Sequence, residues 1–242
     1  MPTYDPTVAR LTYRALLGRR RALILCALPA LLLLIAVAVR GFGAADDDVA
    51  VNLLSGFALA TMVPLIGVIA CTGAIGPEID DGSIVYLLAK PLKRSTIIFT
   101  KLVVAIGITI AFSALPVLVA GLVLVGGSQQ IAAGFAIAAV VASIAYSALF
   151  LLLGTISRHA VVFGLVYALI WEALIGSLVP GARTLSIQQW ALAVADKVVG
   201  SGVTINTEVA LPTAAVLLAA VTVAGTWFAS HKLRGLTLAG EE

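Results

Sequence analysis

Hydrophobic residues in this chain are gathered into six long runs separated by short polar stretches. A helix rises about 1.5 Å per residue and the hydrocarbon core of a bilayer is about 30 Å thick, so roughly 20 apolar residues make one crossing. The runs are too long, and their polar–apolar alternation too weak, for strands of an outer-membrane barrel. The pattern predicts an all-α integral membrane bundle of six transmembrane helices, at roughly residues 22–39, 51–76, 97–125, 131–157, 160–179 and 209–230.

The segment before the first run has the pattern of an amphipathic helix. Asp5 and Pro6 are typical of a helix N-cap and of the first helical position. Apolar residues recur at helical spacing through positions 8–16, with arginines on the other side. We expect an interfacial helix over residues 6–18 that lies on the membrane surface, with a frayed basic leader as the alternative. A cleaved signal peptide is disfavoured, because the first run is longer than a signal h-region.

A second short helix is predicted between the fifth and sixth runs. Pro180 and Gly181 break the fifth run, and Ser186 followed by Gln189 fits a capping box at a helix start. Apolar residues follow at helical spacing, and Gly200 stands where a glycine commonly ends a helix. We expect an amphipathic helix that lies at, or dips into, the outer membrane interface.

Charge and composition fix the class of protein and the orientation of the bundle. The chain is 61% hydrophobic and only 11% charged, whereas a soluble domain is about 25% charged. With the N-terminus in the cytoplasm, the outer side holds only Arg40, Arg183 and Lys197, and the other twelve basic residues lie inside. This bias predicts that both termini are cytoplasmic. The same bias explains the net charge of +3, because basic residues on the inner side are attracted to anionic membrane lipids. We therefore expect no nucleic-acid partner.

The loop at residues 77–94, between the second and third runs, is the one charged stretch with the character of a docking surface. Pro77 is expected to end the second span, and the acids after it to form the first turn of a new helix. Pro91 closes that helix, which predicts about three turns over residues 78–89. A helix this short, carrying both acids and apolar residues, suits the docking of a cytoplasmic partner; a purely structural loop is the alternative.

Glu172 is the one formal charge inside the cores of the six runs. It lies roughly 18 Å from the inner end of its helix, where a carboxylate is costly unless it is paired, hydrated or protonated. Substrate contact, a proton site and a polar lock at a dimer seam are the functional interpretations. A protonated side chain bonded to nearby backbone, or one that reaches water, is the structural interpretation. Tyr146, Tyr167 and Trp171 are further candidates to line a translocation path, with ordinary packing as their alternative.

The sequence carries no phosphate-binding loop and no catalytic or metal-binding constellation. His159 and His231 sit at helix ends, where solvated histidines are common. We therefore expect a chain that is not an enzyme and binds no cofactor or metal, so that any ATP hydrolysis comes from another polypeptide.

The inner loop resembles the cytoplasmic signature of type-2 permease subunits of ATP-binding-cassette (ABC) transporters. The resemblance rests on Glu78-x-x-x-Gly82, on Leu87-Leu88-Ala89-x-Pro91-x-x-Arg94 and on Lys101 at the start of the next span. The basic leader helix, the six spans and the outer helix extend it over most of the chain. It implies a single permease domain over residues 1–242, with residues 77–94 as the coupling loop. The residues that it assigns to ATPase coupling are Glu78, Asp80, Asp81, Gly82, Leu87, Leu88, Pro91 and Arg94.

The resemblance also implies partners and a location. Two permease subunits, as a homodimer or with a similar chain, would pair and bind two cytoplasmic ATPase subunits that hold ATP and Mg²⁺. The location would be the inner membrane of a bacterium. We expect the chain to export its cargo, and the low charge and the modest aromatic content of 7% favour a hydrophobic or amphiphilic one. An ion-gradient-driven secondary transporter and a non-transporting membrane anchor or sensor are the alternatives; the single intramembrane acid and the lack of a clear repeat weigh against the first.

Overall fold

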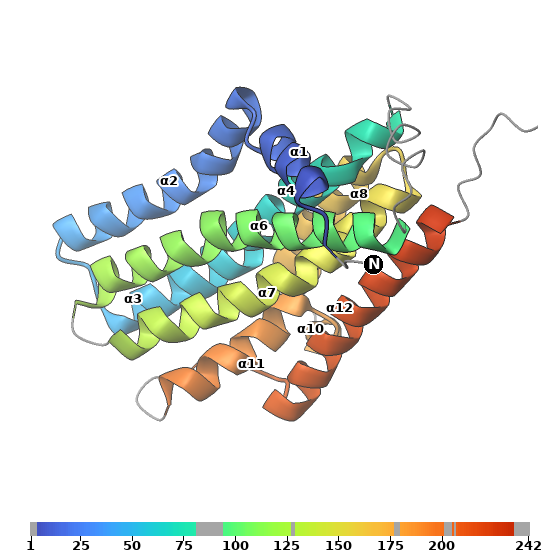
Figure 1. Ribbon diagram of the computed structural model, residues 1–242. Helices are drawn as coiled ribbons and strands as arrows, with labels where there is room; N and C mark the ends of the chain where they lie inside the picture. Colours follow the sequence, from blue (N-terminus) through green and yellow to red (C-terminus); the bar gives the residue numbers. More distant parts are fainter. Residues whose placement is uncertain are drawn as a thin grey trace, which may run out of the picture.

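The structure is a computed structural model in which the described part of the chain is helical and contains no strand. It describes residues 4–80, 94–126, 129–176, 180–200, 205 and 207–234. The helices pack side by side in one bundle (Figure 1). The prediction of an all-α bundle is therefore confirmed.

Within these residues, five helices are long and apolar enough to cross a bilayer. They coincide with the first, second, third, fourth and sixth predicted runs, and the second consists of three consecutive elements. The elements are α2 (Arg19–Gly41), α3 (Asp47–Asn52) with η1 (Leu53–Met62) and α4 (Val63–Asp80), α6 (Arg94–Val125), α7 (Gln129–Ile156) and α12 (Leu211–Arg234).

The fifth predicted run forms a shorter apolar helix. It consists of α8 (Ala160–Val166) and η2 (Tyr167–Ile175). Residues 177–179, with which the predicted span ends, lie outside the described residues. Both η1 and η2 are π-helical, and the two pack against each other. Such segments are rare and are found frequently at functional sites.

The N-terminal helix α1 (Pro6–Leu16) starts as predicted. The Asp5 carboxylate accepts hydrogen bonds from the backbone N–H groups of Thr7, at 2.8 Å, and Val8, at 3.0 Å. One face of α1 packs on α4 and α6, which buries Val8 and Leu16, while Leu11 is 53% exposed. The predicted apolar face is thus divided between the bundle and the surroundings, and its position on a membrane surface stays a prediction.

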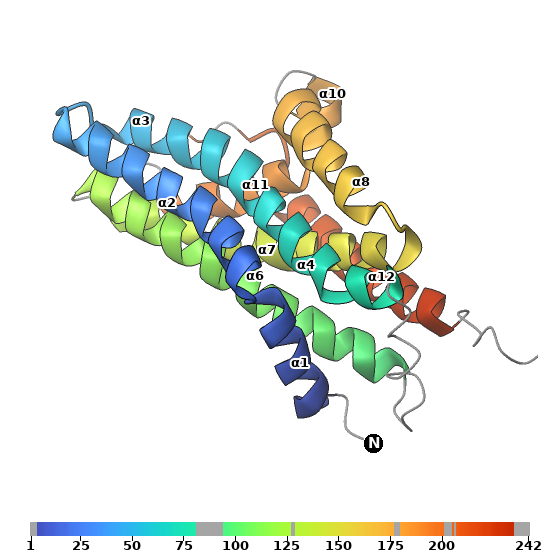
Figure 2. The same cartoon turned by 90° about the horizontal axis from the view of Figure 1, so that it is seen from above.

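The bundle has two ends with different charge. The helix α1, the end of α4, the start of α6 and the end of α12 lie together (Figure 1, Figure 2). We call this end the basic end, because it carries Arg10, Arg14, Arg21 and Lys232. The loop between α2 and α3, the end of α6 and the start of α7 lie at the other end, which we call the opposite end (Figure 1).

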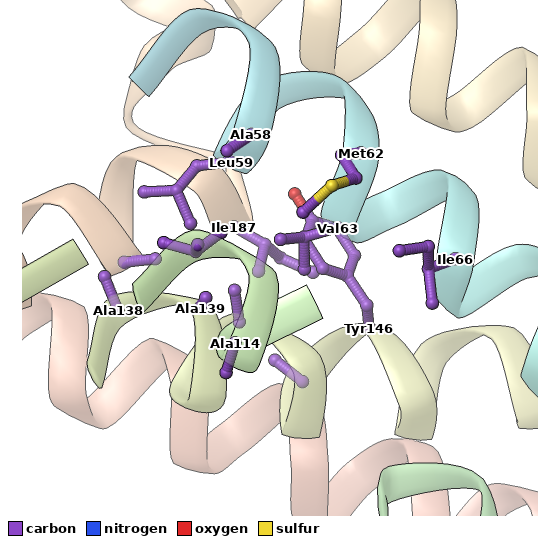
Figure 3. Packing of buried hydrophobic residues seen from close by; sticks show 14 of the residues in the cluster. Ala58, Leu59, Met62, Val63, Ile66, Ala114, Ala138, Ala139, Tyr146 and Ile187 are labelled. Atoms are coloured by element: carbon purple, nitrogen blue, oxygen red, sulfur yellow. The ribbon is translucent and has the colours of Figure 1, made fainter. Parts of the chain in front are cut away.

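Helix α7 is the centre of the packing, since it contacts α4, α6, α11 (Ile187–Val199) and α12. Figure 3 shows Ile187 of α11 among Leu59 and Val63 of the second span and Ala139 of α7. Glycine allows the close approaches: a Cβ at Gly121 would lie 2.8 Å from Ala132 Cα on α7. Small residues at helix contacts are typical of membrane bundles, in which packing, rather than hydrophobic burial, holds helices together.

Candidate functional site

A buried ion pair joins the second and third spans at the basic end. Lys101 Nζ on α6 lies 2.7 Å from Glu78 Oε1 on α4 and donates a second hydrogen bond to the Ala74 carbonyl, at 2.6 Å. The Lys101 side chain is fully buried and that of Glu78 is 23% exposed. A buried ammonium group is tolerated only when it is paired and hydrogen-bonded, and both acceptors come from the last turns of α4. The pair therefore fixes the end of α4 to the start of α6.

The prediction that Pro77 ends the second span is wrong, because α4 continues through it to Asp80. Proline has no N–H to donate to the carbonyl four residues earlier, which belongs to Gly73. That carbonyl accepts a hydrogen bond from Arg21 Nη1 instead, at 3.2 Å. An arginine on α2 thus replaces the missing donor, and Glu78 stands in the last turn of α4 rather than at the start of a new helix.

Of the remaining residues predicted to couple to an ATPase, two stand at helix ends and the others lie outside the described residues. Asp80 is the last residue of α4 and Arg94 is the first residue of α6. The predicted helix 78–89 falls mostly within residues 81–93, which the structure does not describe. That gap contains Asp81, Gly82, Leu87, Leu88 and Pro91.

The second charged site is Glu172, which lies on η2 and is fully buried. Its carboxylate accepts hydrogen bonds from the Tyr167 hydroxyl, at 2.8 Å, and from the Ser186 hydroxyl. It also accepts hydrogen bonds from the backbone N–H groups of Ile187, at 3.0 Å, and Gln188, at 3.4 Å. We call Glu172 and these three residues of 186–188 the Glu172 cap. Residues 186–188 form the start of α11, and a carboxylate near this end complements the positive end of the helix dipole.

Two of the other predicted path residues lie beside this site. Tyr146 on α7 interacts electrostatically with Glu172 and Tyr167, and its hydroxyl is buried beside them. The Phe150 ring stacks on Tyr146 and meets Tyr167 edge to face. Trp171 instead lines an apolar hollow of about 280 Å³ on the outside of η2. The structure therefore brings Glu172, Tyr167 and Tyr146 together, whereas Trp171 shares with Tyr167 only the apolar hollow.

The helix between the fifth and sixth spans is buried more deeply within the bundle than its sequence indicates. It begins after Ser186, whose hydroxyl accepts the Gln189 N–H at 3.3 Å, and it ends before Gly200, which has a φ of 78°. Both boundaries agree with the prediction. However, Gln188 and Gln189 are buried along with the apolar residues of the first two turns. The start of α11 is thus largely buried, whereas an amphipathic surface helix would leave one face exposed.

Sequence reasoning did not identify a row of buried hydroxyl groups between α6 and α7. The Ser113 and Ser143 hydroxyls lie 2.8 Å apart, and the Ser147 hydroxyl donates to Thr109 Oγ1 at 3.4 Å. All four side chains are buried. Their i, i+4 spacing on each helix was the available signal, since hydroxyl groups in one row can bond between neighbouring helices.

A polar cavity of about 670 Å³ lies at the side of α11 that faces the opposite end. Asp48, Asn52 and Ser55 of the second span form one wall, and Gln188 and Gln189 of α11 form another. Its rim includes an ion pair of Arg183 with Glu208, with 2.7 Å between Nη1 and Oε1. Ligand sites commonly have volumes of about 300–1,000 Å³.

Across the described residues, no group of three His, Cys, Asp or Glu side chains is arranged to hold a metal ion.

Comparison with known proteins gives the family. The model of the family described as ABC-2 family transporter protein matches residues 14–182, which include five of the six predicted spans and the inner loop. No curated protein matches the chain. Members of the family are the non-catalytic membrane components of their transporters and typically work with ATPase subunits. The chain belongs to the ABC-2 transporter family and is a multi-pass membrane permease of an ABC transporter.

Proposed function

We propose that the chain exports a hydrophobic or amphiphilic cargo as one of two paired permease subunits, driven by two separate cytoplasmic ATPase subunits bound at the basic end. The observation that carries this proposal is the Glu78–Lys101 ion pair. It joins the two helices between which residues 81–93 run, the segment that the permease resemblance identifies as the coupling loop.

The ion pair gives the inner loop a means of moving the bundle. The Lys101 ammonium is buried and holds two acceptors on α4, so α4 and α6 are joined within about two helical turns of the loop. A force applied to the loop would move both helices together. The ATP-bound and ATP-free partner must favour different arrangements of the bundle, because a ligand shifts an equilibrium only through its differential affinity for the two states.

Pairing with a second permease subunit is supported by the apolar outer surface. Large apolar side chains are exposed on α2, with Leu23 and Leu34 each at 67%, and on η2, with Leu174 at 53%. Lipid or a second copy would cover them. The excess of basic residues at one end supports a cytoplasmic position for both termini, in the inner membrane of a bacterium. In this arrangement ATP and Mg²⁺ are held by the ATPase subunits, and this chain contacts membrane lipids and no nucleic acid.

The experiment that tests the proposal is an affinity purification of the tagged chain from its own membranes in mild detergent. We expect a copurifying ATPase in equal amount, with two copies of each subunit by native mass spectrometry, and ATP hydrolysis in the eluate. Glu78→Ala and Gly82→Pro are expected to leave membrane insertion intact and to weaken docking or coupling. A chain that purifies alone in several mild detergents would contradict the proposal and favour the ion-driven transporter or the anchor.

A further inference from the structure

The backbone N–H groups at the start of α11 are buried and need hydrogen-bond acceptors. Residues Ile187 to Ala193 are all buried, so the first turn of this helix lies inside the protein. The first N–H groups of any helix lack partners within the helix, and a buried N–H group that stays unpaired is costly. A buried helix start therefore requires acceptors from another element.

Glu172 supplies these acceptors from the fifth span. One carboxylate oxygen accepts the Ile187 N–H at 3.0 Å, and the other accepts the Gln188 N–H at 3.4 Å. The Ser186 hydroxyl, which caps the Gln189 N–H, also donates to the second oxygen. Because the negative charge stands at the positive end of a 13-residue helix, the cap is favoured electrostatically as well.

The same turn is also bonded to the second span. Gln188 Nε2 donates to the backbone carbonyl of Ser55 on η1, at 3.0 Å. Gln188 and Gln189 then form one wall of the polar cavity of about 670 Å³. The first turn of α11 therefore joins the two π-helical segments, through Glu172 on η2 and Ser55 on η1, and it positions the amide side chains in the cavity.

We infer that Glu172 is a positioning residue of the transport cycle: it holds the start of α11 on the fifth span, so that the cavity wall formed by Gln188 and Gln189 moves with that span. This inference rests on the proposed function.

The experiment measures how readily water reaches the start of α11. A single cysteine replaces Gln189, which is 8% exposed, in a chain with Cys26→Ser and Cys71→Ala, and a membrane-impermeant maleimide is added to the purified complex in nanodiscs. With Glu172 intact we expect slow labelling that changes at least threefold when ATP is added. With Glu172→Gln we expect labelling at least tenfold faster and insensitive to ATP.

Two controls make the result decisive. Asp196→Asn removes a carboxylate from the same helix, near its other end, and is expected to leave labelling unchanged. If Glu172→Gln does not fold, Ser186→Ala removes one donor of the cap and is expected to raise labelling by a smaller factor. Unchanged labelling in a folded Glu172→Gln chain would overturn the inference.

The two proposals fail in different ways. If labelling rises with Glu172→Gln, but the chain with Glu172 intact shows no response to ATP in a complex that hydrolyses ATP, the role of Glu172 in the transport cycle is overturned. Failure of the proposed function would be seen as the absence of a copurifying ATPase. The labelling without ATP, measured on the chain alone, still decides whether Glu172 holds α11.

Discussion

The Glu78–Lys101 ion pair yields a quantitative prediction, because its two partners differ in burial. Three variants test it: Lys101→Met, Glu78→Gln, and the two changes combined. Loss of one partner from a buried ion pair costs about 3–5 kcal/mol, because the other charge stays buried without compensation. The Lys101 side chain is 0% exposed and that of Glu78 is 23% exposed. The charge left behind is thus harder to hydrate after Glu78→Gln than after Lys101→Met.

The expected magnitudes follow from this difference. Glu78→Gln leaves the ammonium with the Ala74 carbonyl and little water, which should lower the free energy of unfolding by about 4 kcal/mol. After Lys101→Met the carboxylate can turn toward water, so the loss should be about 2 kcal/mol. The combined variant leaves neither charge and should lose about 3 kcal/mol, which is less than the two single losses together and indicates an interaction energy of about 3 kcal/mol.

The assay is unfolding of the purified chain in mixed micelles with increasing dodecyl sulfate, followed by tryptophan fluorescence. The predicted order of stability is wild type, Lys101→Met, combined variant, Glu78→Gln. Losses that simply add in the combined variant, or a larger loss for Lys101→Met than for Glu78→Gln, would refute the argument that these groups form one buried pair.

Three further predictions concern packing and polar groups. Gly121→Ala should lower the free energy of unfolding by about 1–3 kcal/mol through a clash with α7, whereas Gly107→Ala on the same helix, with open space around it, should not lower it; equal effects in the same unfolding assay would contradict the close approach. Tyr146→Phe removes a buried hydroxyl without a close hydrogen-bond partner among the described residues, so stability should be unchanged or higher by about 1 kcal/mol, and any loss of stability would show that this hydroxyl makes a hydrogen bond. Glu208→Gln should change stability by less than about 1 kcal/mol, because its ion pair with Arg183 is partly exposed; a larger loss would mean that Glu208 has a structural role beyond that pair.

The helices could be predicted from the sequence because their signals are local. Long apolar runs gave the spans, Asp5 gave the start of α1, and Ser186 with Gly200 gave both boundaries of α11. Each of these signals reports a property of a single helix: its length, its N-cap or its terminating glycine. No contact between distant segments was required to interpret them.

The errors arose where one helix depends on another. Pro77 was predicted to end the second span because its missing N–H is a local defect, but Arg21 supplies a donor from 52 positions away. The sequence left several interpretations of Glu172 open. Its carboxylate accepts hydrogen bonds from the start of α11, and the position of α11 in space cannot be deduced from the sequence of the fifth span. The pairing of Lys101 with Glu78 is likewise a contact between two helices and has no signature in either segment alone.

The most direct test of the central claim is to replace residues 81–93 of the tagged chain with a Gly/Ser segment of equal length and purify it from its own membranes. If the chain transmits the work of an ATPase through this loop, the variant is expected to insert normally and to lose both the copurifying ATPase and the ATP hydrolysis found with the wild-type chain. An ATPase that binds and hydrolyses ATP equally well with the replaced loop would contradict the claim.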